Sequence, residues 1–187
     1  YIRLDGKPLL IIYRPTLFKK ETFFEFTNRL RAIASDHGLE GLYLAMVYND
    51  YFEDNPKDWG LDAAVDFPPQ RIVEHRQYVT DGNPVNPAFK GYIYSLNEAI
   101  ESGSLIEANV DFPLFRGIFP AWDNSARKAY SNASVYLQSP AMYRKWLSRI
   151  IKWTKEHHTP DRQFIFINAW NEWAEGAHLE PCLLYTS

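Results

Sequence analysis

Continuous apolar runs alternate along this chain with stretches in which apolar residues recur at helical spacing. The runs 9–13 and 42–48 are apolar at nearly every position and predict buried strands. The stretch 22–36 between them predicts a helix that Thr22 can cap at its start, with Gly38 just past its end. Its apolar positions lie three and four residues apart: Phe23, Phe26, Leu30 and Ile33.

The same alternation continues in the second half of the chain. Residues 139–157 give the clearest helix signal, because Ser139 suits an N-cap, Pro140 suits the first helical position and apolar residues form one face. Polar, turn-rich segments at 49–70 and 73–87 predict loops. The other expected elements are a helix at 95–102 and short strands at 63–67, 92–94, 115–121 and 164–169.

Strands that are apolar throughout and alternate with helices are typical of parallel β/α units. We therefore expect the α/β class and a TIM-type (β/α)8 barrel. A closed barrel usually takes about 250 residues, whereas this chain has 187 residues and offers about five strands. The expectation is accordingly a partial barrel, its C-terminal portion, which forms part of a single catalytic domain over residues 1–181.

Neither end of the chain looks like a natural terminus. The chain starts at Tyr1 rather than at a methionine, and its last residues, 182–187, read CLLYTS. That hexapeptide matches a translation of the transposon-end adapter used in DNA library preparation, so we expect a non-native tail there. The single cysteine, Cys182, falls within it and supports no disulfide or thiol argument.

Composition narrows the classes of partner. The net charge of −3 provides no basic footprint for nucleic acid. No stretch approaches the roughly 20 apolar residues that cross a bilayer. Aromatic residues make up 16% of the chain, including 6 tryptophans; most belong in the core, but some are expected to line a sugar-binding cleft. We expect no nucleic-acid partner, no transmembrane segment in this stretch and a cytoplasmic location.

The strongest candidate site follows the last predicted strand. Glu172 and Glu175 are interleaved there with Trp170 and Trp173. Barrel enzymes carry catalytic groups at the carboxyl ends of strands, and cleavage of a glycosidic bond uses a pair of carboxylates. Residues three apart share a face only in a helical turn, so the acids converge only if the strand has ended by about Trp170. The alternative is a surface helix start, where acidic residues favour the helix dipole.

Two further candidates follow earlier predicted strands. Trp122 and Asp123 come directly after 115–121 and could hold substrate; the alternative for Asp123 is an Asx turn with the next residue. Tyr48 and Asp50 lie at the end of the earlier run, where barrel side chains also reach the active face. We assign all four to substrate binding.

Two polar residues flank the paired acids. Asn171 could hydrogen-bond a sugar hydroxyl or simply cap the turn. His178 stands three residues after Glu175, but metal-binding E-x-x-H motifs occur as pairs, and no second copy is present in the sequence. We therefore expect no metal here and assign both residues to substrate binding. Phosphate-cradling glycine motifs and a D-x-D acid pair are also missing from the sequence, so we expect carboxylate chemistry without a cofactor.

Several spaced motifs together resemble one known family. The run 166–176 reads FINAWNEWAEG, 61–69 reads LDAAVDFPP, 117–124 reads GIFPAWDN, and 5–15 reads DGKPLLIIYRP. In this order they resemble the WbsX-type glycosyltransferase family, which is also called glycoside hydrolase family 99-like. The resemblance covers residues 1 to about 181, roughly the C-terminal half of the family domain.

The resemblance implies a (β/α)8 barrel and a role in bacterial surface polysaccharide or lipopolysaccharide metabolism, with an oligosaccharide or polysaccharide substrate. Glycoside hydrolase family 99 proper contains endo-acting α-mannosidases and mannanases with an E-W-x-E motif. By position, Glu172 resembles the base that deprotonates the sugar 2-hydroxyl and so gives a 1,2-anhydro intermediate, and Glu175 resembles the general acid/base. Two alternatives stay open: a non-catalytic carbohydrate-binding barrel and a nucleotide-sugar-dependent glycosyltransferase.

Overall fold

The structure is a computed structural model of the 187-residue chain. It describes residues 1–49, 52, 54–72, 75–79, 87–106, 110–128 and 131–179. The chain divides into two compact units, each assembled from three separate stretches. Unit 1 comprises residues 1–71, 108–117 and 152–166, and unit 2 comprises 72–107, 118–151 and 167–187.

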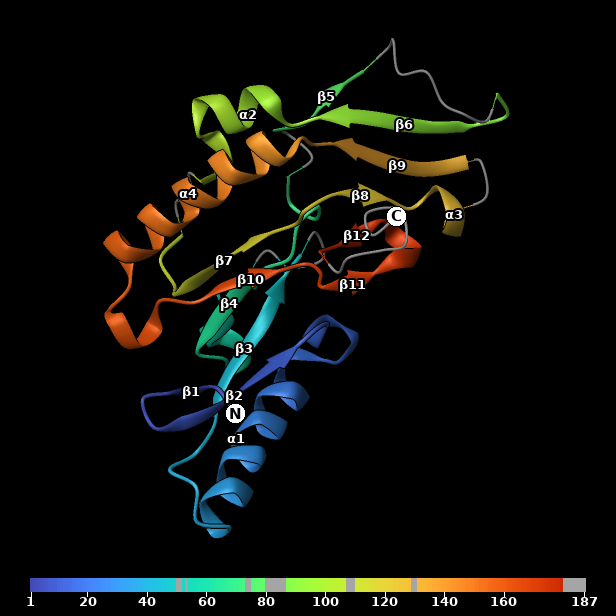
Figure 1. The fold of residues 1–187 in the computed structure, drawn as a ribbon. Coiled ribbons are helices and arrows are strands. Elements are labelled where there is room, and N and C mark those ends of the chain that lie inside the picture. Colours follow the sequence, from blue (N-terminus) through green and yellow to red (C-terminus); the bar gives the residue numbers. More distant parts are fainter. Residues whose placement is uncertain are drawn as a thin grey trace. The chain divides into compact units, whose positions relative to one another are not determined.

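The larger sheet contains six described strands in the order β1-β2-β3-β4-β7-β10 (Figure 1). Its strands are β1 Arg3–Leu4, β2 Lys7–Ile12, β3 Tyr43–Tyr48, β4 Ala63–Asp66, β7 Leu114–Ile118 and β10 Ile165–Ile167. The pairs β2–β3, β3–β4 and β4–β7 are parallel, and β1 runs antiparallel to β2. The apolar runs thus predicted the central strands correctly, and the parallel pairing follows from them.

The core of unit 1 lies on both faces of β3. Leu44 and Met46 pack in one cluster with Phe23 of the first helix. Tyr43 and Ala45 face the other way and pack in a second cluster with Phe115 of β7. Burial on both faces explains why this strand has no polar position in its interior.

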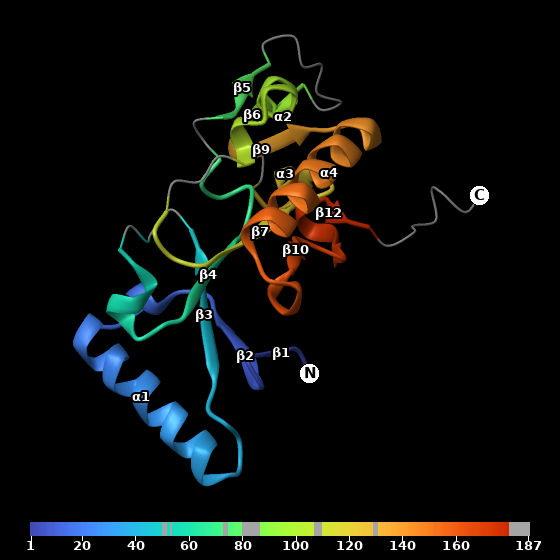
Figure 2. The same cartoon turned by 90° about the vertical axis from the view of Figure 1, so that its left-hand side faces the viewer.

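Helix α1 spans Lys20–Asp36 and lies alongside β2 and β3 in both Figure 1 and Figure 2. Its N-cap is Lys19, whose side chain makes no capping hydrogen bond, so the prediction that Thr22 caps the helix is wrong. The C-terminal end was predicted correctly: Gly38 adopts a φ of +79° just beyond it. A positive φ is a conformation that glycine reaches without steric cost.

The buried face of α1 is not the predicted stripe. Phe23 is 2% exposed as predicted, but the neighbouring buried residues are Thr27 and Ala34. Phe26 and Ile33 are 48% and 45% exposed. The helical period was therefore correct, while the face that turns inward was only partly identified.

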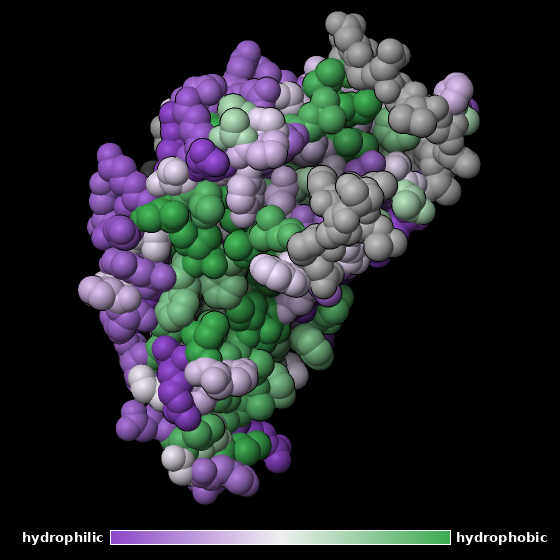
Figure 3. All heavy atoms as spheres, viewed as in Figure 1, coloured by the Kyte–Doolittle hydropathy of each residue, from purple (hydrophilic) through white to green (hydrophobic). Residues whose placement is uncertain are grey.

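Unit 1 also carries exposed apolar side chains on its first strands and helix. Leu10 and Ile11 of β2 are more than one-third exposed, in addition to Phe26 and Ile33 of α1. Figure 3 shows hydrophobic residues, in green, over the part of the surface where β1, β2 and α1 lie in Figure 1. Unit 1 therefore has apolar side chains on its surface as well as in its two core clusters.

The second sheet belongs to unit 2 and has the strand order β5-β6-β9-β8. Its described strands are β5 Gln77–Tyr78, β6 Lys90–Ser95, β8 Trp122–Asp123 and β9 Ser131–Leu137. Strands β6 and β9 are parallel, while β5 and β8 run antiparallel to their neighbours. Only part of β6 was predicted from the sequence, so this mixed sheet is an addition to the expected parallel units.

A row of aromatic residues crosses the second sheet. Tyr78 pairs with Tyr94, Tyr94 with Tyr136, and Tyr136 with Trp122. Residues directly opposite each other in a sheet point to the same face. The rings of Phe119 and Tyr136 meet edge-on, with their centroids 5.7 Å apart. Tyr136, in the middle of the sheet, therefore belongs to the core of unit 2.

The remaining helices are α2 Asn97–Ser102, α3 Ser125–Lys128 and α4 Pro140–His157. As predicted, Ser139 caps α4: its Oγ accepts from the backbone N–H of Met142 at 3.2 Å. Short 3₁₀ helices occupy Pro15–Leu17, Pro56–Trp59, Ser104–Ile106, Pro160–Arg162 and Trp173–Glu175. Among the described residues, no helix combines the length and the apolar character needed to cross a bilayer.

Candidate active site

After β10 the chain leaves the sheet and folds into a small hairpin. Strand β11, Asn171–Glu172, pairs antiparallel with β12, Ala177–His178, and the 3₁₀ helix Trp173–Glu175 connects them. The last sheet strand therefore ends at Ile167, before Trp170, as the convergence of the two acids requires. Glu172 closes one arm of the hairpin and Glu175 lies at the end of its connecting turn.

Gly176 ends this turn in a left-handed conformation, with a φ of +61°. A Cβ atom placed on it would lie 3.0 Å from the backbone nitrogen of Asp123 and 3.1 Å from its Cβ. The hairpin turn thus packs closely against the backbone of the Trp122–Asp123 strand, β8. Two sequence motifs that are about fifty residues apart meet at this glycine.

Replacing Gly176 by alanine is expected to destabilise the protein by about 1–2 kcal/mol, from left-handed strain plus crowding against Asp123. Gly38→Ala is a matched control, because Gly38 has a φ of +79° but open space where a Cβ would lie. Denaturant unfolding should show the larger loss for Gly176→Ala. Equal losses for the two variants would mean that the contact with Asp123 is not tight.

Asp123 and Asn124 fix the short helix that follows β8. The backbone N–H of Ser125 donates to Asp123 Oδ1 at 2.9 Å, so Asp123 does form the Asx turn weighed as its alternative role. Asn124 is buried, and its Oδ1 accepts from the backbone N–H of Ser134 on β9 at 2.8 Å. Helix α3, Ser125–Lys128, is therefore tied to the second sheet at its first turn.

Helix α3 presents Arg127 to the hairpin. The Arg127 guanidinium lies 2.5 Å from Glu175 Oε1 and donates a hydrogen bond to it. The Glu175 side chain is 20% exposed and that of Arg127 is 60% exposed. Figures 1 and 2 both show α3 beside the β11–β12 hairpin. One of the two predicted catalytic acids is thus held by a cation that the sequence did not indicate.

The other acid, Glu172, is half-buried and stands opposite Ala177 in the hairpin. Within the part of the chain that the structure describes, its carboxylate has no hydrogen bond or ion pair. The two acids therefore differ: Glu175 is anchored, and Glu172 remains available to a ligand.

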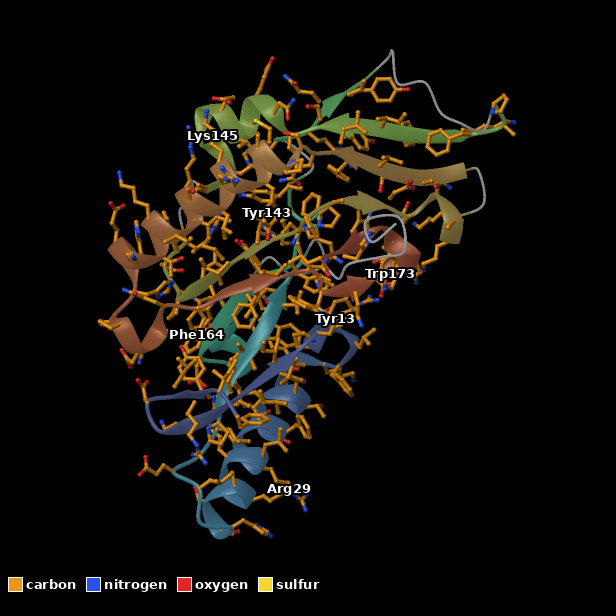
Figure 4. The ribbon with its side chains drawn as sticks, viewed as in Figure 1. Tyr13, Arg29, Tyr143, Lys145, Phe164 and Trp173 are labelled. Atoms are coloured by element: carbon orange, nitrogen blue, oxygen red, sulfur yellow. The ribbon has the colours of Figure 1, made fainter. Side chains whose placement is uncertain are left out.

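The hairpin that carries the acids also carries aromatic side chains. Trp173 stacks on His178, with ring centroids 4.0 Å apart and an interplanar angle of 20°. Trp170 and Trp173 are 64% and 46% exposed, and Figure 4 labels Trp173 at the hairpin. Trp122 is half-buried. Buried Trp122 Nε1 and His178 Nδ1 both lack a hydrogen-bond partner among the described residues.

Unit 2 thus brings together most of the residues predicted for the site. The members of this group are Trp122, Asp123, Trp170, Asn171, Glu172, Trp173, Glu175 and His178. Tyr48 belongs to unit 1. Its ring meets that of Phe112 edge-on, with centroids 5.6 Å apart, and the Arg71 guanidinium carbon lies 3.9 Å from the centroid of the Tyr48 ring. Its role in the site stays a prediction. Asp50 lies outside the described residues.

One charged pair in unit 1 was missed. Asp66 is the last residue of β4, and its carboxylate lies 3.1 Å from the Arg116 guanidinium of β7. The side chains are only 18% and 7% exposed, so both charges are mostly buried although Asp66 falls in a segment predicted as a polar loop with a short strand. Burial raises the pKa of the Asp66 carboxyl, and Arg116 opposes that shift.

No three His, Cys, Asp or Glu side chains gather to hold a metal ion in the described ranges. The hairpin carries two carboxylates and two indole rings, and α3 adds the Arg127 guanidinium that holds Glu175. Such a set can bind hydroxyl groups, stack against the apolar face of a sugar ring and transfer protons.

The chain matches the family described as Glycosyltransferase WbsX over residues 1–187. It is 36% identical over 186 residues to a Xanthomonas campestris pv. campestris (strain B100) protein described as "Uncharacterized protein WxcX". That match covers 97% of this chain and 25% of the relative. A WxcX protein from a second strain of the same pathovar gives the same identity and coverage. The chain thus spans about a quarter of the length of these curated relatives.

Two solved structures resemble the fold. One is described as "Glycoside hydrolase-like protein", with a TM-score of 0.60, 14% identity and coverage of 96% of this chain and 48% of that one. The other is a GH99 endo-alpha-mannosidase from Bacteroides thetaiotaomicron, with a TM-score of 0.54, 15% identity and coverage of 97% and 49%. At such low identity the likeness concerns the mixed α/β fold alone.

Proposed function

Because the chain belongs to the WbsX glycosyltransferase family, we propose that it contributes the paired acids of an enzyme acting on glycosidic bonds. The observation that carries the proposal is the hairpin itself. It sets Glu172 just before and Glu175 at the end of one short turn, and Gly176, which ends that turn, packs against the Trp122–Asp123 strand. Both carboxylates, the hairpin indoles and this strand belong to unit 2, which supports the proposal.

In the proposed reaction, Glu172 removes the proton from the 2-hydroxyl of the sugar. The freed oxygen attacks C1, and a 1,2-anhydro ring forms as the bond from C1 to the leaving oxygen breaks. Glu175 gives its proton to that leaving oxygen and then accepts one from the incoming hydroxyl. As the incoming oxygen bonds to C1, the C1–O2 bond of the ring breaks and O2 takes its proton back from Glu172, so both acids return to their starting states. Water as the incoming molecule gives hydrolysis, and an acceptor sugar gives transfer.

The proposed substrate is an oligosaccharide or polysaccharide of the bacterial surface, with an α-mannoside-like unit at the reacting bond. The half-exposed indole rings of Trp170 and Trp173 are suited to stack on sugar rings. Asn171, Asp123 and His178 supply polar atoms that can reach hydroxyl groups. We further propose that residues 1–181 belong to one catalytic domain of the (β/α)8 type.

The direct test uses the full-length protein that contains this chain, with α-mannosyl fluoride as the probe. We expect release of fluoride, with mannose as the product in buffer and a longer saccharide when a manno-oligosaccharide acceptor is added. Glucosyl, galactosyl and β-mannosyl fluorides serve as comparisons.

Two outcomes of this experiment would contradict the proposal, and each would indicate a different function. Tight binding of manno-oligosaccharides without turnover of any fluoride or glycan would indicate a non-catalytic carbohydrate-binding barrel. Turnover that appears only when GDP-mannose or another nucleotide sugar is supplied would indicate a nucleotide-sugar-dependent transferase.

A further inference from the structure

We infer that Arg127 is a positioning residue, which holds the Glu175 carboxylate in the orientation needed for proton transfer. The inference rests on the proposed function of Glu175. Its structural basis is the contact of 2.5 Å between the guanidinium and Glu175 Oε1, formed by residues 48 positions apart in the sequence.

Both partners of this contact stand on backbone that is fixed independently of the contact itself. On the Arg127 side, Asp123 caps α3 through Ser125, and Asn124 hydrogen-bonds to Ser134 of the sheet. On the Glu175 side, Gly176 packs against the backbone of Asp123. The same residue, Asp123, therefore sets the position of the helix and of the acid's own turn.

Solvent exposure indicates that the pair serves orientation more than folding. The Arg127 side chain is 60% exposed, and exposed ion pairs contribute little to stability. The Glu175 side chain is 20% exposed and has limited room to move. Positioning of a reacting group matters far more for rate, since a displacement of about 1 Å can cost on the order of 100-fold.

The test compares Arg127→Ala, Arg127→Lys and Lys128→Ala in the full-length protein, with α-mannosyl fluoride and a manno-oligosaccharide as substrates. Lys128 is the matched control, because it is the adjacent exposed cation of α3. We expect Arg127→Ala to lower kcat on the oligosaccharide by about 10- to 100-fold and on α-mannosyl fluoride by less, with KM within about threefold and an unchanged thermal midpoint. Arg127→Lys should recover part of the rate, and Lys128→Ala should match wild type.

A second comparison separates positioning from a general structural role. In a Glu175→Gln background, the Arg127→Ala change should cause little further loss, because the two residues act as one unit. An Arg127→Ala enzyme within twofold of wild type, or a full additional loss in the Glu175→Gln background, would overturn the inference alone. An inactive wild-type protein would instead refute the proposed function on which the inference rests.

Discussion

Full-length protein carrying Glu172→Gln or Glu175→Gln is expected to lose about 10²- to 10⁴-fold in kcat on a manno-oligosaccharide, with KM little changed. Glutamine keeps the size and hydrogen-bonding capacity of each side chain but cannot exchange a proton. Glu98→Gln is a suitable control, because Glu98 is an exposed acid in the first turn of α2 in the same unit.

The leaving group distinguishes the two acids. Fluoride departs without protonation, so Glu175→Gln should lose less activity on α-mannosyl fluoride than on the oligosaccharide. Glu172→Gln should lose a similar factor on both substrates, since the 2-hydroxyl must be deprotonated in either case. Turnover within tenfold of wild type for either variant on the oligosaccharide would contradict the assignment.

Replacing Arg116 by methionine is expected to destabilise the protein by about 3–5 kcal/mol at neutral pH, because it leaves the Asp66 carboxylate buried without its partner. The pair is 3.1 Å apart and mostly buried in unit 1. Arg29→Met is the control, since Arg29 is exposed on α1, as Figure 4 shows. The double variant Arg116→Met/Asp66→Asn should recover much of the loss, because an amide carries no charge to be buried.

The cost of Arg116→Met should depend on pH in a defined direction. Burial raises the pKa of Asp66 above the value of 3.8 that it has in an exposed state, and removal of Arg116 takes away the largest influence opposing that shift, leaving the Gly117 backbone hydrogen bond and the Arg71 charge. The folded variant then binds a proton more tightly than the unfolded chain, so it gains stability as pH falls through the raised pKa. Urea unfolding at several pH values checks this; a cost that grows towards acid pH would contradict the burial of Asp66.

The elements that could be predicted from the sequence are those with a clear apolar pattern. Strand β3 is buried on both faces, and helix α4 buries one face through residues such as Trp146 and Ile150. Strand β9 was missed because Ser131, Asn132 and Ser134 make its first half polar. Its pairing depends on partners such as the Asn124 side chain, which accepts from Ser134 N–H. Local pattern cannot reveal such a tertiary partner.

The inward face of α1 shows a second limit. Phenylalanines occur on more than one side of this helix, so periodicity fixed the period and left the face ambiguous. Thr27 turns inward because its hydroxyl donates to the Phe24 carbonyl at 2.8 Å and because Gly60 packs directly against it. A Cβ on Gly60 would lie 2.2 Å from Thr27 Oγ1, so the face of α1 that carries Thr27 can pack here only against a glycine.

The sequence predicted those site residues whose side-chain type suits the chemistry and which also follow the end of a strand. Glu172 and Glu175 follow the end of a strand and alternate with tryptophans, so their residue types point to the same chemistry. Arg127 gave no such signal, because it is an exposed cation on a four-residue helix and meets Glu175 only through folding. Asp66 was missed because its buried partner, Arg116, comes from a strand about fifty residues later.

The most direct measurement is a crystal structure of the full-length Glu172→Gln variant with a manno-oligosaccharide that it cannot turn over. We expect one sugar ring within hydrogen-bond distance of both residue 172 and Glu175, with an indole of the hairpin against its face. Saccharide bound elsewhere, or the two side chains directed away from each other with either one facing bulk solvent, would contradict this expectation.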